Sequence, residues 1–136
     1  DLAASIGLAQ LKKIKFLNDS RNRIIKKYID GTKNLKNIDT KFNFRLTNAS
    51  YWLFIIKCSK RDKLIKYLKQ NGISSAVHFK PLPLQPLYKN YKSKITNAKK
   101  EWVKIISLPL FPDLKISEVN FIIKILKKFD KNFNKY

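Results

Sequence analysis

The chain has 136 residues, about the length of one globular domain with a single hydrophobic core. Hydrophobic residues make up 44% of it, which is enough apolar surface for a folded protein and excludes a disordered chain. No apolar run approaches the roughly 20 residues that cross a bilayer, and the first residues lack the layout of a signal peptide. Because Cys58 is the only cysteine, no internal disulfide can form, and we expect a cytoplasmic protein without membrane contact.

A formal net charge of +21 raises the question of a nucleic-acid partner. Nucleic-acid-binding proteins favour arginine, which makes bidentate contacts with phosphates and guanine. Here the basic residues are mostly lysines spread over every segment, and the arginines are only Arg21, Arg23, Arg45 and Arg61. We therefore interpret the charge as a solvated surface that would also suit an anionic substrate. A basic nucleic-acid-binding module is kept as the alternative.

Residues 1–28 predict one long N-terminal helix, since they contain no proline and their apolar residues recur at helical spacing. Gly7 is the exception, because glycine costs up to about 1 kcal/mol relative to alanine inside a helix. A glycine suits this position if another backbone packs closely against it. Asp30 and Gly31 indicate where the helix ends.

The next segment predicts a strand followed by a helix. Residues 51–56 are a continuous apolar run of β-favouring residues, which is typical of a strand buried on both faces. Ser59 and Asp62 have the spacing of a capping box at the start of a helix, and Asn71 with Gly72 indicates its end. The apolar side of this helix consists of Leu64, Ile65 and Leu68.

Residues 73–79 suit a second strand, and the loop after it contains Pro81, Pro83 and Pro86, which exclude a regular helix or a central strand. His78 therefore lies at the end of a predicted strand, just before a loop that proline stiffens. Binding sites often present a side chain in this rigid way. The alternative is a structural histidine whose ring is satisfied by nearby backbone groups.

Residues 99–106 predict a short helix, and residues 107–112 an extended segment. The last helix has the clearest pattern, with lysines opposite an apolar stripe. The stripe consists of Ile116, Val119, Ile122, Ile123, Leu126 and Phe129. The order of elements predicts an α/β fold in which helices pack on a small sheet.

Searches for common catalytic motifs leave the function open. His78 and Cys58 are the only residues of their types, so the usual His and Cys metal cluster cannot be assembled, and we expect no metal site. The three glycines are far apart and form no phosphate-binding loop. The nine acidic residues are scattered and form no convincing acid–base pair.

Several blocks nevertheless resemble one enzyme family. Residues 78–88, which read HFKPLPLQPLY, resemble the His-Phe/Tyr-x-Pro-Leu-His-x-Gln/His-Pro-x-Tyr signature of the DegT/DnrJ/EryC1/StrS sugar aminotransferases. Residues 1–11 resemble the family's Asp-Leu-x-Ala-Ala-x-Gly-x-x-Gln-Leu helix, and residues 107–114 its closing Ser-Leu-Pro segment. With residues 50–54, these blocks follow the family's order over essentially the whole chain. Pro83 departs from the signature, because the family commonly has a second histidine there.

The resemblance implies the α/β small C-terminal domain of a fold-type-I, perosamine-synthase-like aminotransferase that depends on pyridoxal 5'-phosphate, with a long N-terminal helix and a mainly antiparallel sheet. Such enzymes transfer an amino group, usually from glutamate, to a nucleotide-linked keto sugar, often in polysaccharide biosynthesis. The cofactor lysine belongs to their large domain, so we expect no catalytic or cofactor-binding residue here and no activity of the chain alone. Residues 1–31 would link the two domains, and residues 32–136 would form the small one.

The same resemblance implies two sets of functional residues. At the mouth of the active site we expect His78, Phe79 and Lys80 to bind substrate, with Lys80 near a phosphate. At a domain or homodimer interface we expect Leu2, Ile6, Gly7 and Gln10. A stand-alone interaction domain derived from an aminotransferase is a further alternative.

Overall fold

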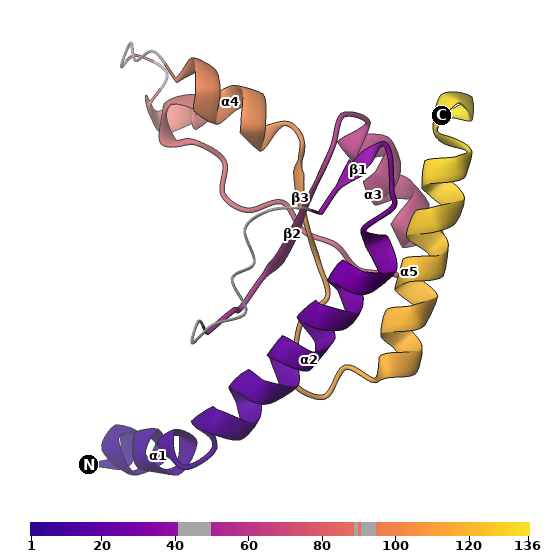
Figure 1. The fold of residues 1–136 in the computed structure, drawn as a ribbon. Helices are drawn as coiled ribbons and strands as arrows, with labels where there is room; N and C mark the ends of the chain where they lie inside the picture. Colours follow the sequence, from indigo (N-terminus) through magenta and orange to yellow (C-terminus); the bar gives the residue numbers. More distant parts are fainter. Residues whose placement is uncertain (41–49, 89, 91–94) are drawn as a thin grey trace.

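The computed structural model describes residues 1–40, 50–88, 90 and 95–136, and Figure 1 shows their arrangement. The α-helices of this part are α1 (Leu2–Leu11), α2 (Ile14–Thr32), α3 (Arg61–Gln70), α4 (Thr96–Trp102) and α5 (Ile116–Lys131). The strands are β1 (Ile38–Asp39), β2 (Phe54–Cys58) and β3 (Ile105–Leu108), and three short 3₁₀ helices are η1 (Leu82–Leu84), η2 (Pro86–Tyr88) and η3 (Phe133–Lys135). The predicted α/β fold with a small antiparallel sheet is confirmed.

The sheet has the order β1-β2-β3, and both pairings are antiparallel. Helices α2, α3 and α5 form a layer on one face of it (Figure 1). β2 buries alternate residues, Phe54, Ile56 and Cys58, against this layer, whereas Ile55 and Lys57 on the opposite face are half-buried. The prediction of a strand buried on both faces is therefore wrong, because the described helices cover only one face. The strand also begins at Phe54 rather than Tyr51.

In the core, α2 packs against both the sheet and α5. The Tyr28 ring stacks on Phe54 with ring centroids 4.6 Å apart, and the Tyr28 hydroxyl donates a hydrogen bond to the Pro109 carbonyl oxygen at 3.1 Å. Gly31 lies against α5, since a Cβ added to it would be 2.5 Å from Ile123 Cδ1 and 3.0 Å from its Cγ2. A side chain at position 31 would separate the two helices, so this glycine permits their close approach.

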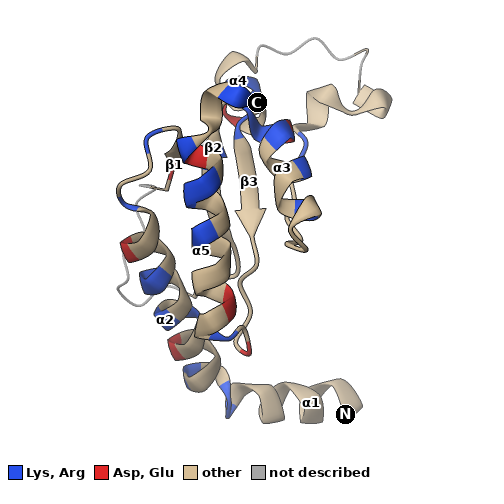
Figure 2. Ribbon diagram, turned by 90° about the vertical axis from the view of Figure 1, so that its right-hand side faces the viewer, with Lys and Arg blue, Asp and Glu red and all other residues tan. Residues whose placement is uncertain are grey.

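The predicted long N-terminal helix is two helices. The α-helical pattern is broken at Lys12 and Lys13, and α1 projects from the N-terminal end of α2 at a clear angle (Figure 2). α1 buries no residue in this chain, whereas α2 buries one side and continues to Thr32, past the predicted end. The helix continues beyond Asp30 and Gly31 because Gly31 packs against α5 instead of ending the helix. None of the helices in the described ranges is long and apolar enough to cross a membrane.

The segment predicted as a second strand, residues 73–79, is not a strand. Only Ala76 pairs with the sheet, through two backbone hydrogen bonds with Ser107 of 2.7 and 3.1 Å. The chain then leaves the sheet edge toward Pro81, whose ring cannot donate a ladder hydrogen bond. The proline loop contains no α-helix, as predicted, but it does form the short turns η1 and η2.

Two predicted helix boundaries also differ. The helix expected over residues 99–106 is α4, which ends at Trp102, because Ile105 and Ile106 pair with β2 instead. The predicted capping box at α3 is absent. Lys60 occupies the N-cap position without a side-chain cap, and Asp62 pairs with Arg61.

Two other predictions about helices are confirmed, namely the end of α3 and the apolar stripe of α5. Gly72 follows α3 with a positive φ of 73°, the left-handed conformation that glycine adopts at little cost. The stripe predicted for the last helix is confirmed in α5, where all its members are buried except Ile116, which is half-buried. Glu118 Oε2 accepts a hydrogen bond of 2.8 Å from the Lys115 backbone N–H and so fixes the start of this helix.

Candidate functional site

Three aromatic side chains form a cluster outside the core, which we call the ring cluster: Trp52, His78 and Phe79. The Trp52 ring centroid lies 6.1 Å from that of His78 and 6.2 Å from that of Phe79, and the last two are 5.5 Å apart. Trp52 precedes β2, whereas the other two follow the bridge at Ala76. Trp52 and Phe79 are 61% and 72% exposed. The structure therefore joins two of the predicted site residues to a tryptophan that the sequence patterns did not identify.

A groove of about 530 Å³ lies beside the ring cluster and includes Trp52 in its wall. Its lining includes Ile55 and Lys57 from the less buried face of β2, so the groove lies on the face of the sheet that α2, α3 and α5 leave open. The other lining residues that matter here are Leu53, Glu101 and Ile105. A mostly apolar hollow with a few polar groups has the character and size of a small-molecule site.

The charged part of the groove is one ion pair, between Lys57 and Glu101. The hydrogen bond and charge of Lys57 hold the pKa of the Glu101 carboxyl below its usual value. The carboxylate therefore stays ionised at neutral pH, and the pair presents both N–H donors and oxygen acceptors to the groove.

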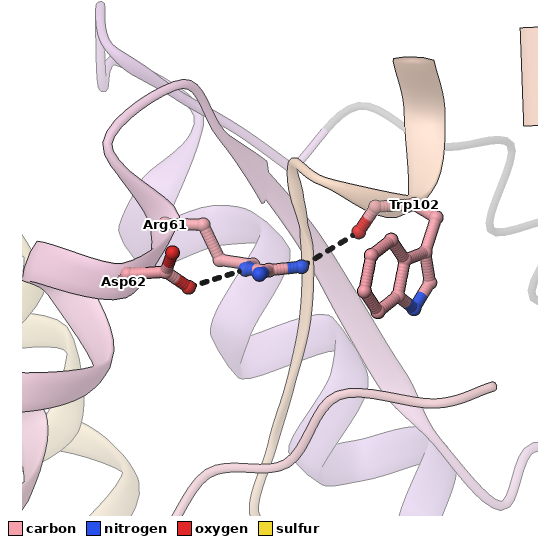
Figure 3. Close-up of polar contacts among 3 residues, drawn as sticks. All are labelled: Arg61, Asp62 and Trp102. Atoms are coloured by element: carbon pink, nitrogen blue, oxygen red, sulfur yellow. Dashed lines mark hydrogen bonds and ion pairs between the residues drawn. The ribbon is translucent and has the colours of Figure 1, made fainter. Parts of the chain in front are cut away.

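Arg61 fixes the end of α4 at Trp102, the residue that follows Glu101 in the sequence (Figure 3). Its Nη1 donates to the Trp102 carbonyl oxygen at 2.9 Å, its Nε donates to Asp62 Oδ1 at 2.8 Å, and its guanidinium carbon lies 5.1 Å from the Trp102 ring centroid. Arg61 thus joins the start of α3 to the end of α4 and holds one wall of the groove in place. The sequence signal for this role was weak, namely one arginine in a chain whose basic residues are mostly lysines.

Lys80, the third predicted substrate-binding residue, is exposed at the start of the proline loop. The turns after it are closed by backbone hydrogen bonds, from Leu84 N to the Pro81 oxygen and from Gln85 N to the Leu82 oxygen, both of 2.9 Å. The loop therefore gives His78, Phe79 and Lys80 a rigid support. Their substrate-binding role stays a prediction.

The predicted interface residues all lie on α1. Leu2, Ile6, Gly7 and Gln10 are exposed, and no atom lies within 4 Å of a Cβ added to Gly7. The close backbone approach expected at Gly7 is therefore not made within this chain, although Gly31 makes one. An interface at α1 stays a prediction.

The described residues do not fit pyridoxal phosphate on their own. The cofactor needs a lysine amine for its Schiff base and a set of donors for its phosphate. No described lysine is buried, and the one in the groove, Lys57, is paired with Glu101. No three His, Cys, Asp or Glu side chains of the described ranges gather as a metal site would require.

A second hollow, of about 440 Å³, lies between the end of α3 and the start of α5. Phe111 and Phe121 line it, each 47% exposed, but no predicted site residue does. We therefore place the candidate site at the ring cluster and the groove beside it.

Comparison with known proteins identifies the family. The sequence profile described as the DegT/DnrJ/EryC1/StrS aminotransferase family matches residues 1–127. The chain therefore belongs to this family, and the resemblance seen in the sequence is confirmed.

Individual relatives agree in sequence and fold. The uncharacterized protein MJ1066 of Methanocaldococcus jannaschii is 32% identical over 140 residues, which cover 94% of this chain and 36% of that protein. The putative sugar aminotransferase Spr1654 from Streptococcus pneumoniae, in its PLP form, is 33% identical with a TM-score of 0.83 over 95% of this chain and 35% of that one. S. venezuelae DesV in complex with a ketimine intermediate shares the fold, with a TM-score of 0.85 over 94% of this chain and 36% of that one, at 21% identity. The chain thus spans about a third of the length of these relatives.

Proposed function

We propose that this chain is the small C-terminal domain of a pyridoxal-phosphate-dependent sugar aminotransferase. The observation that carries the proposal is the family match over residues 1–127, and the similarity to Spr1654, a putative sugar aminotransferase described in PLP and PMP forms, supports it. Residues 1–31 link the two domains, and residues 32–136 form the small one. The remaining two thirds of the parent protein bind the cofactor and contain the lysine of its Schiff base.

The parent enzyme moves an amino group, with glutamate as donor, onto a keto sugar carried by a nucleotide. Bound pyridoxal phosphate supplies the electron sink that this transfer needs. His78 and Phe79 contribute one wall of the active site, since an exposed aromatic cluster on a rigid loop marks a surface that something covers. Lys80, exposed beside them, provides a cation for the substrate phosphates.

α1 is proposed as the contact with the rest of the parent protein and with a second copy in a homodimer. It carries no charged residue from Leu2 to Leu11 and buries none of them in this chain, although Leu2, Ile6 and Leu8 are large apolar side chains. A helix that is apolar on all sides is stable in water only when protein covers it. Gly7, with open space around it, then admits a close backbone approach.

The proposal is tested on the full-length protein, taken to be cytoplasmic and purified with pyridoxal phosphate. We expect glutamate to abolish the visible absorbance of the bound cofactor and to yield one 2-oxoglutarate per site. A protein that binds no pyridoxal phosphate, or whose cofactor no amino acid converts, contradicts the proposed function.

The role of His78 is tested separately by steady-state kinetics of His78→Ala. We expect a higher KM for the nucleotide sugar or a lower turnover, because the ring cluster loses one of its three members. Asn120→Ala, at an exposed position on α5, is the control and should behave as the unmodified enzyme. Unchanged kinetics of His78→Ala would remove His78 from the site.

A further inference from the structure

Trp52 belongs both to the ring cluster and to the wall of the groove on the open face of the sheet. We propose that Trp52 is the platform on which the base of the nucleotide sugar stacks, with the groove receiving that base. The inference rests on the proposed function and adds to it a residue and the part of the substrate that the residue binds.

The contrast between the two tryptophans supports this role. Trp102 is half-buried under the Arg61 guanidinium, which lies over its ring. Trp52 is 61% exposed, and the two rings beside it are tilted by 52° and 37° instead of stacking flat on it. His78 and Phe79 therefore orient the indole and still leave much of its surface accessible. A large aromatic surface that the described fold does not cover is suited to stacking with another planar ring.

The chemistry of the groove favours the base over the other parts of a nucleotide sugar. Its apolar lining includes Leu53, Ile55 and Ile105, and its charges, Lys57 and Glu101, neutralise each other. An uncharged heteroaromatic ring suits such a lining, and the ion pair can hydrogen-bond to the polar edge of the ring. A diphosphate would instead need cations that are not neutralised by a carboxylate, and the exposed Lys80 directly follows Phe79 of the ring cluster.

The rival occupant of the Trp52 surface is the rest of the parent polypeptide, which would bury the indole before any substrate arrives. Measuring nucleotide binding distinguishes a Trp52 ring covered by protein from one that stacks on the base. If protein covers Trp52, the loss of its ring affects folding and assembly and gives no effect specific to the base.

The experiment is isothermal titration calorimetry on the full-length protein with the diphosphates of uridine, thymidine, cytidine, guanosine and adenosine, and with inorganic pyrophosphate as the probe without a base. Trp52→Ala should weaken binding of the preferred nucleoside diphosphate by about 5- to 150-fold, the equivalent of the ~1–3 kcal/mol that one stacked base contributes. Trp52→Phe should retain most of the affinity, and pyrophosphate should bind both variants as it binds the unmodified protein. Phe121→Ala, which removes another exposed ring outside the groove, is the matched control and should change neither affinity.

The inference is overturned if none of the five nucleotides binds, if Trp52→Ala changes nucleotide affinity less than twofold, or if it weakens nucleotide and pyrophosphate binding equally. Failure of the proposed function gives a different result. Conversion of the cofactor by glutamate in the unmodified protein requires no nucleotide, so its absence contradicts the aminotransferase proposal without bearing on Trp52.

Discussion

The two faces of β2 differ in what lies against them, although their side chains alternate along the same short strand. Phe54 and Ile56 are fully buried under α2, α3 and α5, whereas Ile55 and Lys57, one residue away, line a groove. Helices cover one face and complete the core, whereas the described residues of the other face line a mostly apolar groove that contains one ion pair. The comparison shows that a strand rich in β-favouring residues does not have to be buried on both of its faces. Its second apolar face can belong to a binding site.

The helical layer differs again, because basic residues recur along α2, α3 and α5 (Figure 2). On α5 the exposed cations are Lys124, Lys127, Lys128 and Lys131. Lysine is almost never fully buried unless it is paired and is depleted in protein interfaces, so this surface suits contact with water. The lysines of α5 and the candidate site therefore lie on opposite sides of the sheet.

The largest expected effect on stability comes from truncating one side chain on each face of β2 in separate variants. Phe54→Ala should lower the free energy of unfolding by about 3–5 kcal/mol, because it leaves a cavity under Tyr28, whereas Ile55→Ala on the half-buried face should cost roughly 1 kcal/mol. Urea unfolding followed by circular dichroism measures both. Equal losses for the two variants would mean that both faces of the strand are buried.

The second effect comes from replacing glycine by alanine at two positions, in separate variants. Gly31→Ala should destabilise the fold by about 1–2 kcal/mol, since overpacking against Ile123 outweighs the gain in helix propensity. Gly7→Ala, where nothing lies within 4 Å, should raise the helicity of α1. Urea unfolding and far-ultraviolet circular dichroism provide the two readouts. Ile123→Val in the Gly31→Ala background should recover part of the loss, and the absence of any recovery would place the strain elsewhere.

The third effect is a loss of stability at alkaline pH that depends on Tyr28. Burial raises the pKa of its hydroxyl above the ordinary value of 10.0, so the folded state keeps the proton that the unfolded state releases. The stabilisation is complete below pH 10 and decreases as the pH rises above it. Tyr28→Phe should remove this dependence and cost ~0.5–1.5 kcal/mol at neutral pH through the lost hydrogen bond to Pro109. Unfolding curves at pH 8 to 11, a range that spans the reference pKa values of Tyr and Lys, test this prediction. Identical slopes for both proteins would contradict it.

The smallest effect concerns the lysine surface. Lys124→Gln removes a like-charge neighbour four residues from Lys128 and should raise stability by only about 0.2–0.5 kcal/mol, a gain that added salt removes. Urea unfolding at two salt concentrations measures it.

If the surface serves solvation alone, binding of generic RNA or DNA should be weak at physiological salt. Tight binding with a steep salt dependence would instead support the nucleic-acid-binding alternative.

Prediction from sequence was most accurate where a local pattern determines the structure. The stripe of α5 requires only the 3.6-residue period and a core to face, and the end of α3 requires only a glycine that adopts positive φ. Predictions were wrong where a partner distant in sequence decides the result. Ile105 and Ile106 suit either a helix or a strand until they pair with β2. Gly31 resembles a helix stop until it is seen to pack against Ile123.

The sequence by itself determined the family, the helices α3 and α5, and the position of His78 and Phe79 before a loop that proline stiffens. Only the tertiary structure decided that Trp52, 26 residues before His78, joins that histidine in one cluster and that Arg61 holds the end of α4 through the Trp102 carbonyl oxygen. The physical reason is that helix periods, turns and proline constraints are local and appear in short stretches of sequence. A binding surface instead depends on which residues packing brings together, and on which face of the sheet the described helices leave open.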